Sequence, residues 1–496
     1  MLQWYFQIRR KGVAFSKAHP LFFMGSAIWI GCFLPSHLLC MFFLVLLIPL
    51  FGLPRAMIAY LLIASALFSC WQRVRVPPPG LYRGQLECEV IDRQQMRKGK
   101  NLCWKVTLSV NNFWDQKGSL LAKGVRATIT TSELSSLRAG AVYRFFATVH
   151  VDEKNRARLF LASTEPIHKV RETLSLVEWR LSIRRGIERV FSTLFKDLDV
   201  RSLAGAMTLG LFKTPALQES LNRVGLGHLL AISGFHFGCV VALVLFITHW
   251  CGTKLQFVLS LSLISLYFIL VGFSPSILRA FCAATLLLLA KAMYRQSSGL
   301  NSLGLGLIVI LLYDPAMATH VGLHLSFLAT AALLLYSPSV RKGLEALFVP
   351  RSVEQVLTFS WTDQILTGIL YRSIPLFSII IPVWAVVSFY QMAFFQECSL
   401  LGLIYNLALP LLFSLSIPFV LLALLFSPIS LLGKLFATVA TAFLKIGLQL
   451  INAAPHVGSI SVSSLPLMWV YAVFVFIIIG GIALYRDEAD GWKACL

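Results

Sequence analysis

Gly-Leu-Gly-His-Leu-Leu-Ala-Ile-Ser-Gly-Phe-His-Phe-Gly-Cys, residues 225–239, places four glycines, two histidines and one serine inside an apolar stretch. A helix that faces lipid is expected to be uniformly apolar, because polar groups are costly in hydrocarbon. Backbone that is not helical is tolerated at membrane depth only where protein or a water-filled cavity covers it. The stretch therefore predicts either a polar path through a helical bundle or a glycine-rich packing seam with hydrogen-bonded histidines.

The composition of the whole chain indicates a membrane protein. Of the 496 residues, 57% are hydrophobic and only 13% are charged, against roughly 25% charged in soluble domains. A soluble core cannot bury so much apolar side chain, so disordered, fibrous and disulfide-dense secreted proteins are excluded. We expect a polytopic α-helical membrane protein. The predicted spans after residue 200 cover 225–249, 255–273, 276–294, 302–318, 320–337, 374–390, 397–427 as one or two elements, 430–451 and 466–485.

Residues 1–75 are predicted to hold the N-terminal transmembrane helices. The apolar stretch 21–71 is broken near Pro35 and Pro54, which favours three short helices or two longer ones. Lys and Arg are enriched in cytoplasmic segments, and the basic residues before this stretch predict a cytoplasmic N-terminus: Arg9, Arg10, Lys11 and Lys17. Three crossings would then put the next segment outside the cytoplasm.

Residues 76–166 have the pattern of a small β domain. Five short runs with alternating or β-branched character are separated by turn residues, which favours an inserted small β-barrel (OB-like), extracytoplasmic, over a β-sandwich of similar pattern. Residues 72–200 carry 23 Lys and Arg against 13 Asp and Glu, a net charge of +10. In an oxidising compartment Cys88 and Cys103 would be candidates for a disulfide.

Residues 167–200 carry an apolar stripe with helical spacing and arginines on the other faces. This pattern predicts an amphipathic helix, either at the membrane interface or packed on the barrel. Residues 201–496 are predicted to form a polytopic transmembrane domain.

Arg279 follows Pro275 by four residues, one turn into a predicted span. A guanidinium there is costly unless it snorkels, pairs or faces water, so it is expected either to line a polar path or to pair with Asp314. His320 and His324 have the i, i+4 spacing of a metal pair, but no nearby carboxylate or thiol completes a site. We expect no metal and no other cofactor.

The sequence has no GxxxxGK[ST] phosphate loop, no HEXXH or GxSxG motif, and no His-x-His-x-Asp-His cluster. We therefore expect no ATPase, protease or metallo-β-lactamase nuclease activity, and we expect the chain not to be an enzyme. Any transport must then be driven by a partner, a gradient or pulling from the far side.

Residues 228–238, His-Leu-Leu-Ala-Ile-Ser-Gly-Phe-His-Phe-Gly, resemble the signature of the ComEC family of competence proteins, membrane channels for DNA uptake in bacteria. The resemblance extends through most of residues 200–410, and the family layout also places an OB-like domain after a few N-terminal helices. The further matching stretches are 204–211, Leu217 to Gly225, 274–280, 314–327 and 406–410.

The resemblance implies a competence (transformation) channel of the bacterial cytoplasmic (inner) membrane, which passes single-stranded DNA across it. Residues 201–496 would form its polytopic channel domain. The implied channel residues are His228, Ser233, Gly234, His236, Gly238, Arg279, Asp314, Ser326 and Asn406. The implied partners are single-stranded DNA, membrane lipid, a DNA receptor, a cytoplasmic DNA-pulling ATPase, a separate nuclease and a second copy in a homo-oligomer.

A basic β domain with aromatic side chains can hold a single strand by phosphate attraction and base stacking. Each aromatic alone is more typical of a barrel core, but the set beside basic residues favours DNA binding. The candidates are Arg97, Lys98, Lys100, Trp104, Lys105, Trp114, Lys117 and Tyr143.

The chain departs from the family at three places. Lys213 stands where the family has an acidic residue, and Leu323-His324 stands where the family has Phe-Gln. Many members also end in a metallo-β-lactamase-like domain, which this sequence lacks, so strand degradation would need another polypeptide. The alternatives are a transporter or lipid/polymer-handling membrane protein, a degenerate family member without a DNA uptake role, and an intramembrane enzyme that uses His228, Ser233 and His236.

Overall fold

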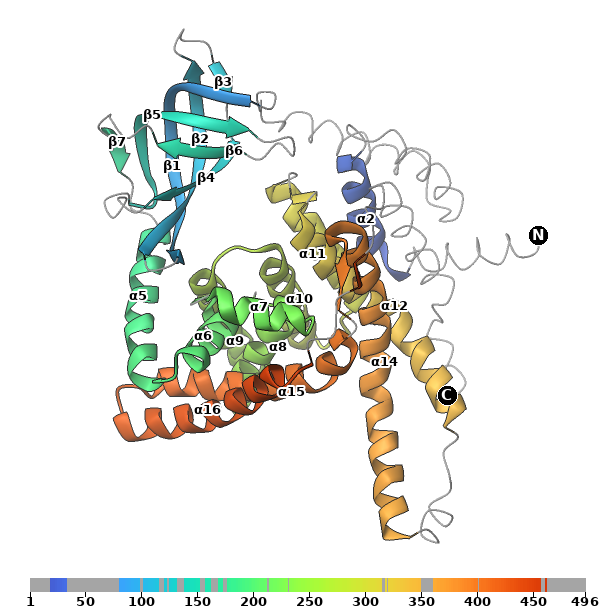
Figure 1. Ribbon diagram of the computed structural model, residues 1–496. Coiled ribbons are helices and arrows are strands. Elements are labelled where there is room, and N and C mark those ends of the chain that lie inside the picture. The colour runs from blue at the N-terminus through green and yellow to red at the C-terminus, as the bar shows by residue number, and fades with distance from the viewer. Residues whose placement is uncertain are drawn as a thin grey trace, which may run out of the picture. The chain divides into compact units, whose positions relative to one another are not determined.

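The chain forms two compact units, residues 71–193 and residues 1–70 with 194–496, which we call the β unit and the membrane unit (Figure 1). The predicted boundaries 1–75, 76–166, 167–200 and 201–496 divide the chain more finely and stay predictions. The computed structural model describes residues 18–33, 80–98, 101–115, 120–122, 125–131, 138–151, 157–161, 168–172, 176–211, 214–230, 232–314, 317–318, 320–348, 360–399, 401–455 and 460–461.

The β unit contains a sheet in which each of the five predicted strand segments lies in a strand. The strands pair in the order β1-β2-β4-β6-β5-β7, β3 pairs with β2, and β1 also pairs with β5. The β4–β6 pair is parallel, and the other pairs are antiparallel. The bounds are β1 Gly80–Lys98, β2 Asn101–Asp115, β3 Leu120–Ala122, β4 Val125–Thr131, β5 Ala141–Val151, β6 Ala157–Leu161 and β7 His168–Glu172.

The core of the β unit comes from alternate positions of three strands, because successive side chains of a strand point to opposite faces. Leu86 of β1 lies opposite both Phe113 of β2 and Phe145 of β5, and all three are buried. On the other face, Glu87 and Arg144 are direct cross-strand partners and form an ion pair of 2.6 Å.

Helix α5 (Leu176–Leu194) follows the sheet and carries the predicted amphipathic pattern. It buries Leu181 and Phe191, while Trp179 on another face is 49% exposed. A carboxylate oxygen of Glu178 accepts a hydrogen bond of 3.1 Å from the N–H of Ala139, just before β5. These contacts tie α5 to the sheet within the β unit.

The predicted disulfide between Cys88 and Cys103 is wrong, because Cys88 is a free, fully buried thiol. The register pairs Cys88 with Val110 and Cys103 with Met96, eight residues further along β1. At about 3.3 Å per residue this separation is about 26 Å, whereas a disulfide needs Cα atoms within about 7 Å. Burial, with a smaller contribution from the Glu87 carboxylate, raises the pKa of Cys88 to about 12.

In its described residues the membrane unit is helical apart from the short pair β8 (Glu397–Cys398) and β9 (Ile460–Ser461). Its helices are α2 Pro20–Phe33, α6 Leu198–Leu209, α7 Pro215–Arg223, η2 Gly227–Leu230, α8 Gly234–Ile247, α9 Thr253–Val271, α10 Pro275–Ala292, α11 Gly299–Tyr313, α12 Val321–Leu347, α14 Trp361–Phe395, α15 Leu401–Leu425 and α16 Ser430–Asn452.

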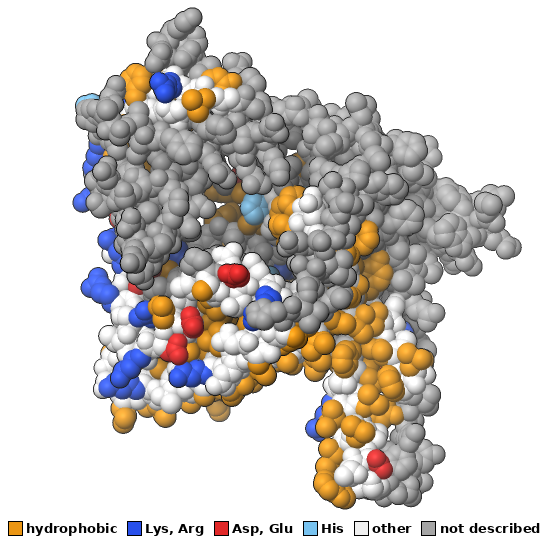
Figure 2. Space-filling model, viewed as in Figure 1, with side chains coloured by type: hydrophobic (Ala, Val, Ile, Leu, Met, Phe, Trp, Pro, Cys, Tyr) orange, Lys and Arg blue, Asp and Glu red, His pale blue; other side chains and the backbone are white. Residues whose placement is uncertain are grey.

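Among the described residues, six helices are long and apolar enough to cross a membrane, namely α9, α10, α12, α14, α15 and α16. Helices α8 and α11 are apolar but shorter. Figure 2 shows apolar side chains on the exposed sides of α14, where Ile365, Leu366 and Ile369 are more than half exposed. An exposed apolar surface of this kind is what lipid requires.

The predicted spans locate the helices and misplace several of their ends. The span 225–249 is interrupted, since η2 and a non-helical step precede α8. The span 374–390 is the central part of α14, and 397–427 is the single helix α15. Both long helices contain two prolines, which membrane helices tolerate because neighbouring groups satisfy the freed carbonyls. The predicted span 466–485 and most of 21–71 lie outside the described residues.

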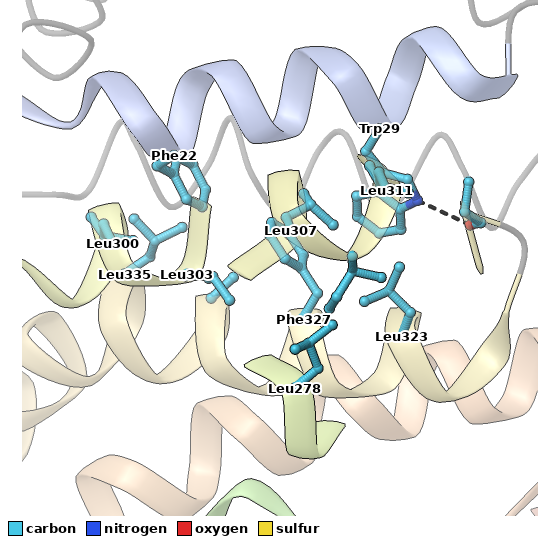
Figure 3. Close-up of a cluster of buried hydrophobic side chains, with 13 residues drawn as sticks. Phe22, Trp29, Leu278, Leu300, Leu303, Leu307, Leu311, Leu323, Phe327 and Leu335 are labelled. Carbon is cyan, nitrogen blue, oxygen red and sulfur yellow. Dashed lines mark hydrogen bonds between the residues drawn. The ribbon is translucent and has the colours of Figure 1, made fainter. Parts of the chain in front are cut away.

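Helix α2 packs against α11 through glycines, because their lack of a side chain lets the two backbones approach closely. A Cβ added to Gly25 would lie 2.6 Å from the carbonyl oxygen of Gly304. Farther along, Nε1 of Trp29 donates a hydrogen bond of 3.0 Å to the carbonyl of Ala318. Phe22 and Trp29 thereby enter the buried cluster drawn in Figure 3, with Leu278 of α10 and Phe327 of α12.

Candidate translocation site in the membrane unit

Helix α8 begins inside the unusual glycine-rich stretch. Ser233 is its N-cap, and its Oγ accepts a hydrogen bond of 3.3 Å from the N–H of His236. The Nδ1 of His236 accepts a hydrogen bond of 3.4 Å from the N–H of Ser233. This is a capping box in which histidine takes the place of the usual Glu or Gln, so Ser233 and His236 are engaged in starting a helix.

Arg279 extends from the first turns of α10 towards neighbouring helices. Its Nε donates a hydrogen bond of 3.0 Å to Oγ of Ser326 in α12. Among the described residues the Arg279 side chain makes no other hydrogen bond and no ion pair. Its other guanidinium nitrogens are not among the buried polar atoms that lack a partner, so they keep some solvent-accessible surface. Arg279 is therefore a largely enclosed cation without an ion-pair partner among the described residues.

Two glycines make room for this side chain. A Cβ at Gly234, the first residue of α8, would fall inside the contact distance of the Arg279 Nη2 atom. A Cβ at Gly306 of α11 would lie 3.3 Å from Cγ and 3.4 Å from Cα of Arg279. Residues of α8, α11 and α12 thus surround Arg279 of α10, Gly306 at its aliphatic part and Gly234 and Ser326 at its guanidinium. The predicted site residues Gly234, Arg279 and Ser326 come together there.

The pairing of Arg279 with Asp314, one of the two arrangements left open by the sequence, does not occur among the described residues. Asp314 is instead the C-cap of α11. Each histidine of the i, i+4 pair has its own structural role. Nδ1 of His320 caps α12 by accepting a hydrogen bond from the N–H of Gly322. His324 hydrogen-bonds through Nδ1 to the Tyr390 hydroxyl at 2.6 Å, and through Nε2 to the Ala318 carbonyl.

Three further predicted channel residues, His228, Gly238 and Asn406, make no hydrogen bond with Arg279. His228 in η2 is exposed, although its neighbours Leu229 and Leu230 are buried, and it is close enough to His236 to interact electrostatically. Gly238 is exposed and has no atom within 4 Å of where a Cβ would be. Asn406 donates a hydrogen bond from Nδ2 to the Gly402 carbonyl within α15 and belongs to a different contact.

That contact joins the turn before η2 to the start of α15. Gly225 has a φ of +74°, and a Cβ on it would lie 2.9 Å from Cα of Gly402. Oγ of Ser399 donates a hydrogen bond of 3.0 Å to the Arg223 carbonyl, and Nη2 of Arg223 donates one of 2.9 Å to the Ile451 carbonyl of α16. The glycine-rich stretch therefore contains a packing seam at Gly225 and a polar site at Gly234.

In the β unit, the structure contradicts one of the predicted DNA contacts. Tyr143 is 5% exposed, and its hydroxyl accepts a hydrogen bond of 2.8 Å from the N–H of Arg138. Its ring belongs to the core and cannot stack on a base. Trp114 is half-buried in β2. Four other candidates lie in strands β1 and β2, but their side chains are not described: Arg97, Lys98, Trp104 and Lys105. The last two candidates, Lys100 and Lys117, lie outside the described residues.

Gly306 was missed by the sequence analysis. The run Gly304-Leu-Gly306 within an apolar span is a pattern of small residues typical of close helix contact, and it points to both glycines of α11. Ser326, in contrast, was identified by its place in a matching stretch, while nothing in its local sequence indicates that it bonds Arg279.

The comparisons with known proteins agree with this picture. The family model described as "Competence protein" matches residues 213–487, more than half of the chain. The ComE operon protein 3 of Bacillus subtilis (strain 168) is 29% identical over 161 residues, which cover 32% of this chain and 21% of that protein. The matched stretch thus spans about a fifth of that relative. No solved structure matches.

Family membership, together with the six helices of spanning length in the part of the chain that the structure describes, identifies a multi-pass protein of the cytoplasmic membrane. The chain belongs to the competence protein family, of the ComEC type.

Proposed function

We propose that this protein is a membrane channel that passes single-stranded DNA across the cytoplasmic membrane during DNA uptake. The observation that carries the proposal is the Arg279 guanidinium, which is held by Ser326 and has no ion-pair partner among the described residues. An unpaired cation among membrane helices is costly unless it faces water or an anion. A hydrated path through which a polyanion passes would supply the water and the anion that this cation needs.

The distribution of basic residues supports an orientation for the channel. In our proposal the helices α8 to α16 cross the membrane in alternate directions, so the connections between them lie on its two sides in turn. The connections 272–274, 314–320 and 396–400 carry no Lys or Arg. The opposite ends carry Lys254, Lys291, Arg295, Arg341, Lys342 and Lys434. Because basic residues favour the cytoplasmic side, that second set of ends is cytoplasmic in our proposal.

Helix α2 supports the same orientation. The N–H of Leu21 donates a hydrogen bond of 3.2 Å to the side-chain oxygen of Asn301, at the start of α11. Trp29 bonds to Ala318, beyond the end of α11. Helix α2 therefore runs parallel to α11 and begins on the side with the basic ends. Arg279 is then about 6 Å from the extracytoplasmic start of α10.

We further propose that the β unit is an extracytoplasmic OB-like barrel. Its support is the pairing pattern, which runs β1-β2-β4-β6-β5 and returns from β5 to β1, with β4 and β6 parallel. The core strands bury Leu86, Phe113 and Phe145, so only aromatics outside this core are available for stacking. Trp114 and the basic residues of β1 and β2 remain the proposed contacts with DNA.

The proposed partners are single-stranded DNA, membrane lipid, a DNA receptor, a DNA-pulling ATPase in the cytoplasm and a separate nuclease. A homo-oligomer is compatible with the exposed apolar helices. The alternative functions are a lipid- or polymer-handling transporter and a family member without a role in DNA uptake. Under either of them, deletion of the protein would leave the uptake of labelled DNA unchanged.

The test is uptake of labelled DNA in a strain that lacks this protein and is complemented with the full chain. Label that becomes resistant to external nuclease should be lost in the deletion strain and restored by the wild-type chain. The variant Arg279→Gln should not restore it, whereas Arg295→Gln at the proposed cytoplasmic end should. Uptake that does not depend on the protein would reject the proposal.

A further inference from the structure

The end of the Arg279 side chain lies against the first residue of α8. A Cβ at Gly234 would collide with Nη2 of Arg279, so the guanidinium edge and the helix N-terminus are in direct contact. Ser233 already accepts the N–H of His236, whereas the N–H groups of Gly234 and Phe235, the first two of α8, have no partner within the helix. The helix dipole adds partial positive charge there. The two features together concentrate positive potential at one point.

The hydrogen bond to Ser326 fixes which edge of the guanidinium is available. It uses Nε, and the Nη groups have no hydrogen-bond partner among the described residues. An arginine edge presents parallel N–H donors that match a phosphate bidentately, and helix N-termini also bind phosphate. The contact with Gly306 supports the aliphatic part of the side chain from behind.

We propose that the Nη edge of Arg279 and the first turn of α8 bind one phosphodiester group of the transported strand. This inference rests on the proposed function and adds a specific anion site to it. Ser326 and Gly306 are positioning residues, which hold Arg279 so that it faces the strand. The site recognises phosphate and not bases, so it accepts any sequence.

The site lies where a strand that enters from the proposed extracytoplasmic side meets the bundle. Arg279 is one turn into α10, Gly234 is the first residue of α8, and Ser326 is in the second turn of α12. The proposed extracytoplasmic connections between these helices, 272–274, 314–320 and 396–400, carry no Lys or Arg. Arg279 would therefore be the first cation of these helices that the strand reaches.

The test uses the full chain in phosphatidylcholine nanodiscs and a short abasic phosphodiester strand as the probe. Affinity is measured against salt concentration, because each phosphate contact adds about 0.7 to the logarithmic salt slope for a single strand. Arg279→Gln should weaken binding about tenfold and lower the slope by about 0.7, as expected for one lost phosphate contact. Arg279→Lys should keep the slope, since its charge remains.

Ser326→Ala should weaken binding with little change of slope, and Ser326→Thr, which keeps a hydroxyl, should restore it. If the wild-type chain binds no strand at all, the proposed function itself is rejected. Wild-type binding with an unchanged slope in Arg279→Gln would overturn the phosphate site alone. Loss of the Arg279 dependence in phosphatidylglycerol nanodiscs would assign the site to lipid headgroups and would also overturn it.

Discussion

Gly234 and Arg279 occupy complementary space: the guanidinium of Arg279 in α10 lies where any side chain at the first residue of α8 would have to be. The glycine is thus required by the arginine and not by the backbone, since φ at Gly234 is not in the left-handed region. Leu278 and Phe327, the sequence neighbours of Arg279 and Ser326, are anchored in the buried cluster of Figure 3. That packing limits how far the arginine can move away.

Gly234→Ala should therefore abolish DNA uptake while the protein still accumulates in the membrane. Alanine favours a helix over glycine by about 1 kcal/mol, so the helix itself does not suffer, whereas the guanidinium must leave its place. Gly238→Ala is the matched control one turn further along α8, because nothing lies within 4 Å of its added Cβ. Uptake should be measured with immunoblots of both variants. Equal uptake by the two variants would contradict the role given to Gly234.

Single cysteines introduced at the helix ends should report the proposed orientation. Lys254→Cys and Arg295→Cys should react with a membrane-impermeant maleimide only after the cells are opened, because both lie at the basic, cytoplasmic ends. Glu397→Cys, on the opposite side, should react in intact cells. Labelling of Glu397→Cys only in opened cells would show that the proposed orientation is inverted. Arg279 would then not lie near the side from which DNA enters.

Gly225→Ala should destabilise the membrane unit by about 2 kcal/mol or more, since alanine at φ +74° is strained and its Cβ would press on Gly402. Gly343→Ala in α12 is the control: its Cβ meets no atom within 4 Å, so stability should be unchanged or slightly higher. The check is the thermal unfolding midpoint of the purified chain in detergent. A midpoint for Gly225→Ala equal to that of the wild type would show that the seam with α15 is loose.

Cys88 should resist alkylation by iodoacetamide at pH 8 in the folded protein and react fully after unfolding. Burial raises its pKa from 9.0 to about 12, so the reactive thiolate is scarce at pH 8. The folded state binds the proton more tightly than the unfolded state, so the stabilisation is complete below pH 9. It is lost as the pH rises towards 12. Mass spectrometry of the labelled peptide gives the result, and rapid labelling at pH 8 would contradict the buried position.

Much of this arrangement could be predicted from the sequence, because it depends on local pattern. Hydropathy located the helices of the membrane unit, and the alternation of apolar and polar residues located the strands. A single span was predicted over 225–249, although Gly227, Gly234 and Gly238 indicated either close helix contact or a break. The resemblance of short motifs also selected Gly234, Arg279 and Ser326, which lie within a single site.

What the sequence could not supply were the pairings between distant segments. Arg279 had two candidate arrangements, and only the fold shows that it bonds Ser326 and not Asp314. Tyr143 looked like a DNA contact because its neighbours are basic, but the strand register turns its ring into the core. The register also separates Cys88 from Cys103. In each case the outcome depends on which face of an element a neighbour covers, and local spacing does not determine that.

The most direct measurement of the central claim is the reaction of Arg279→Cys with the anionic reagent MTSES, applied outside cells that retain no other reactive cysteine. The account predicts rapid modification, because the side chain borders a hydrated path, and slower modification when transported DNA is present. Leu287→Cys is the control on the same helix, since Leu287 is 45% exposed on the apolar surface and should not react in lipid. Modification of Leu287→Cys but not of Arg279→Cys would contradict the account.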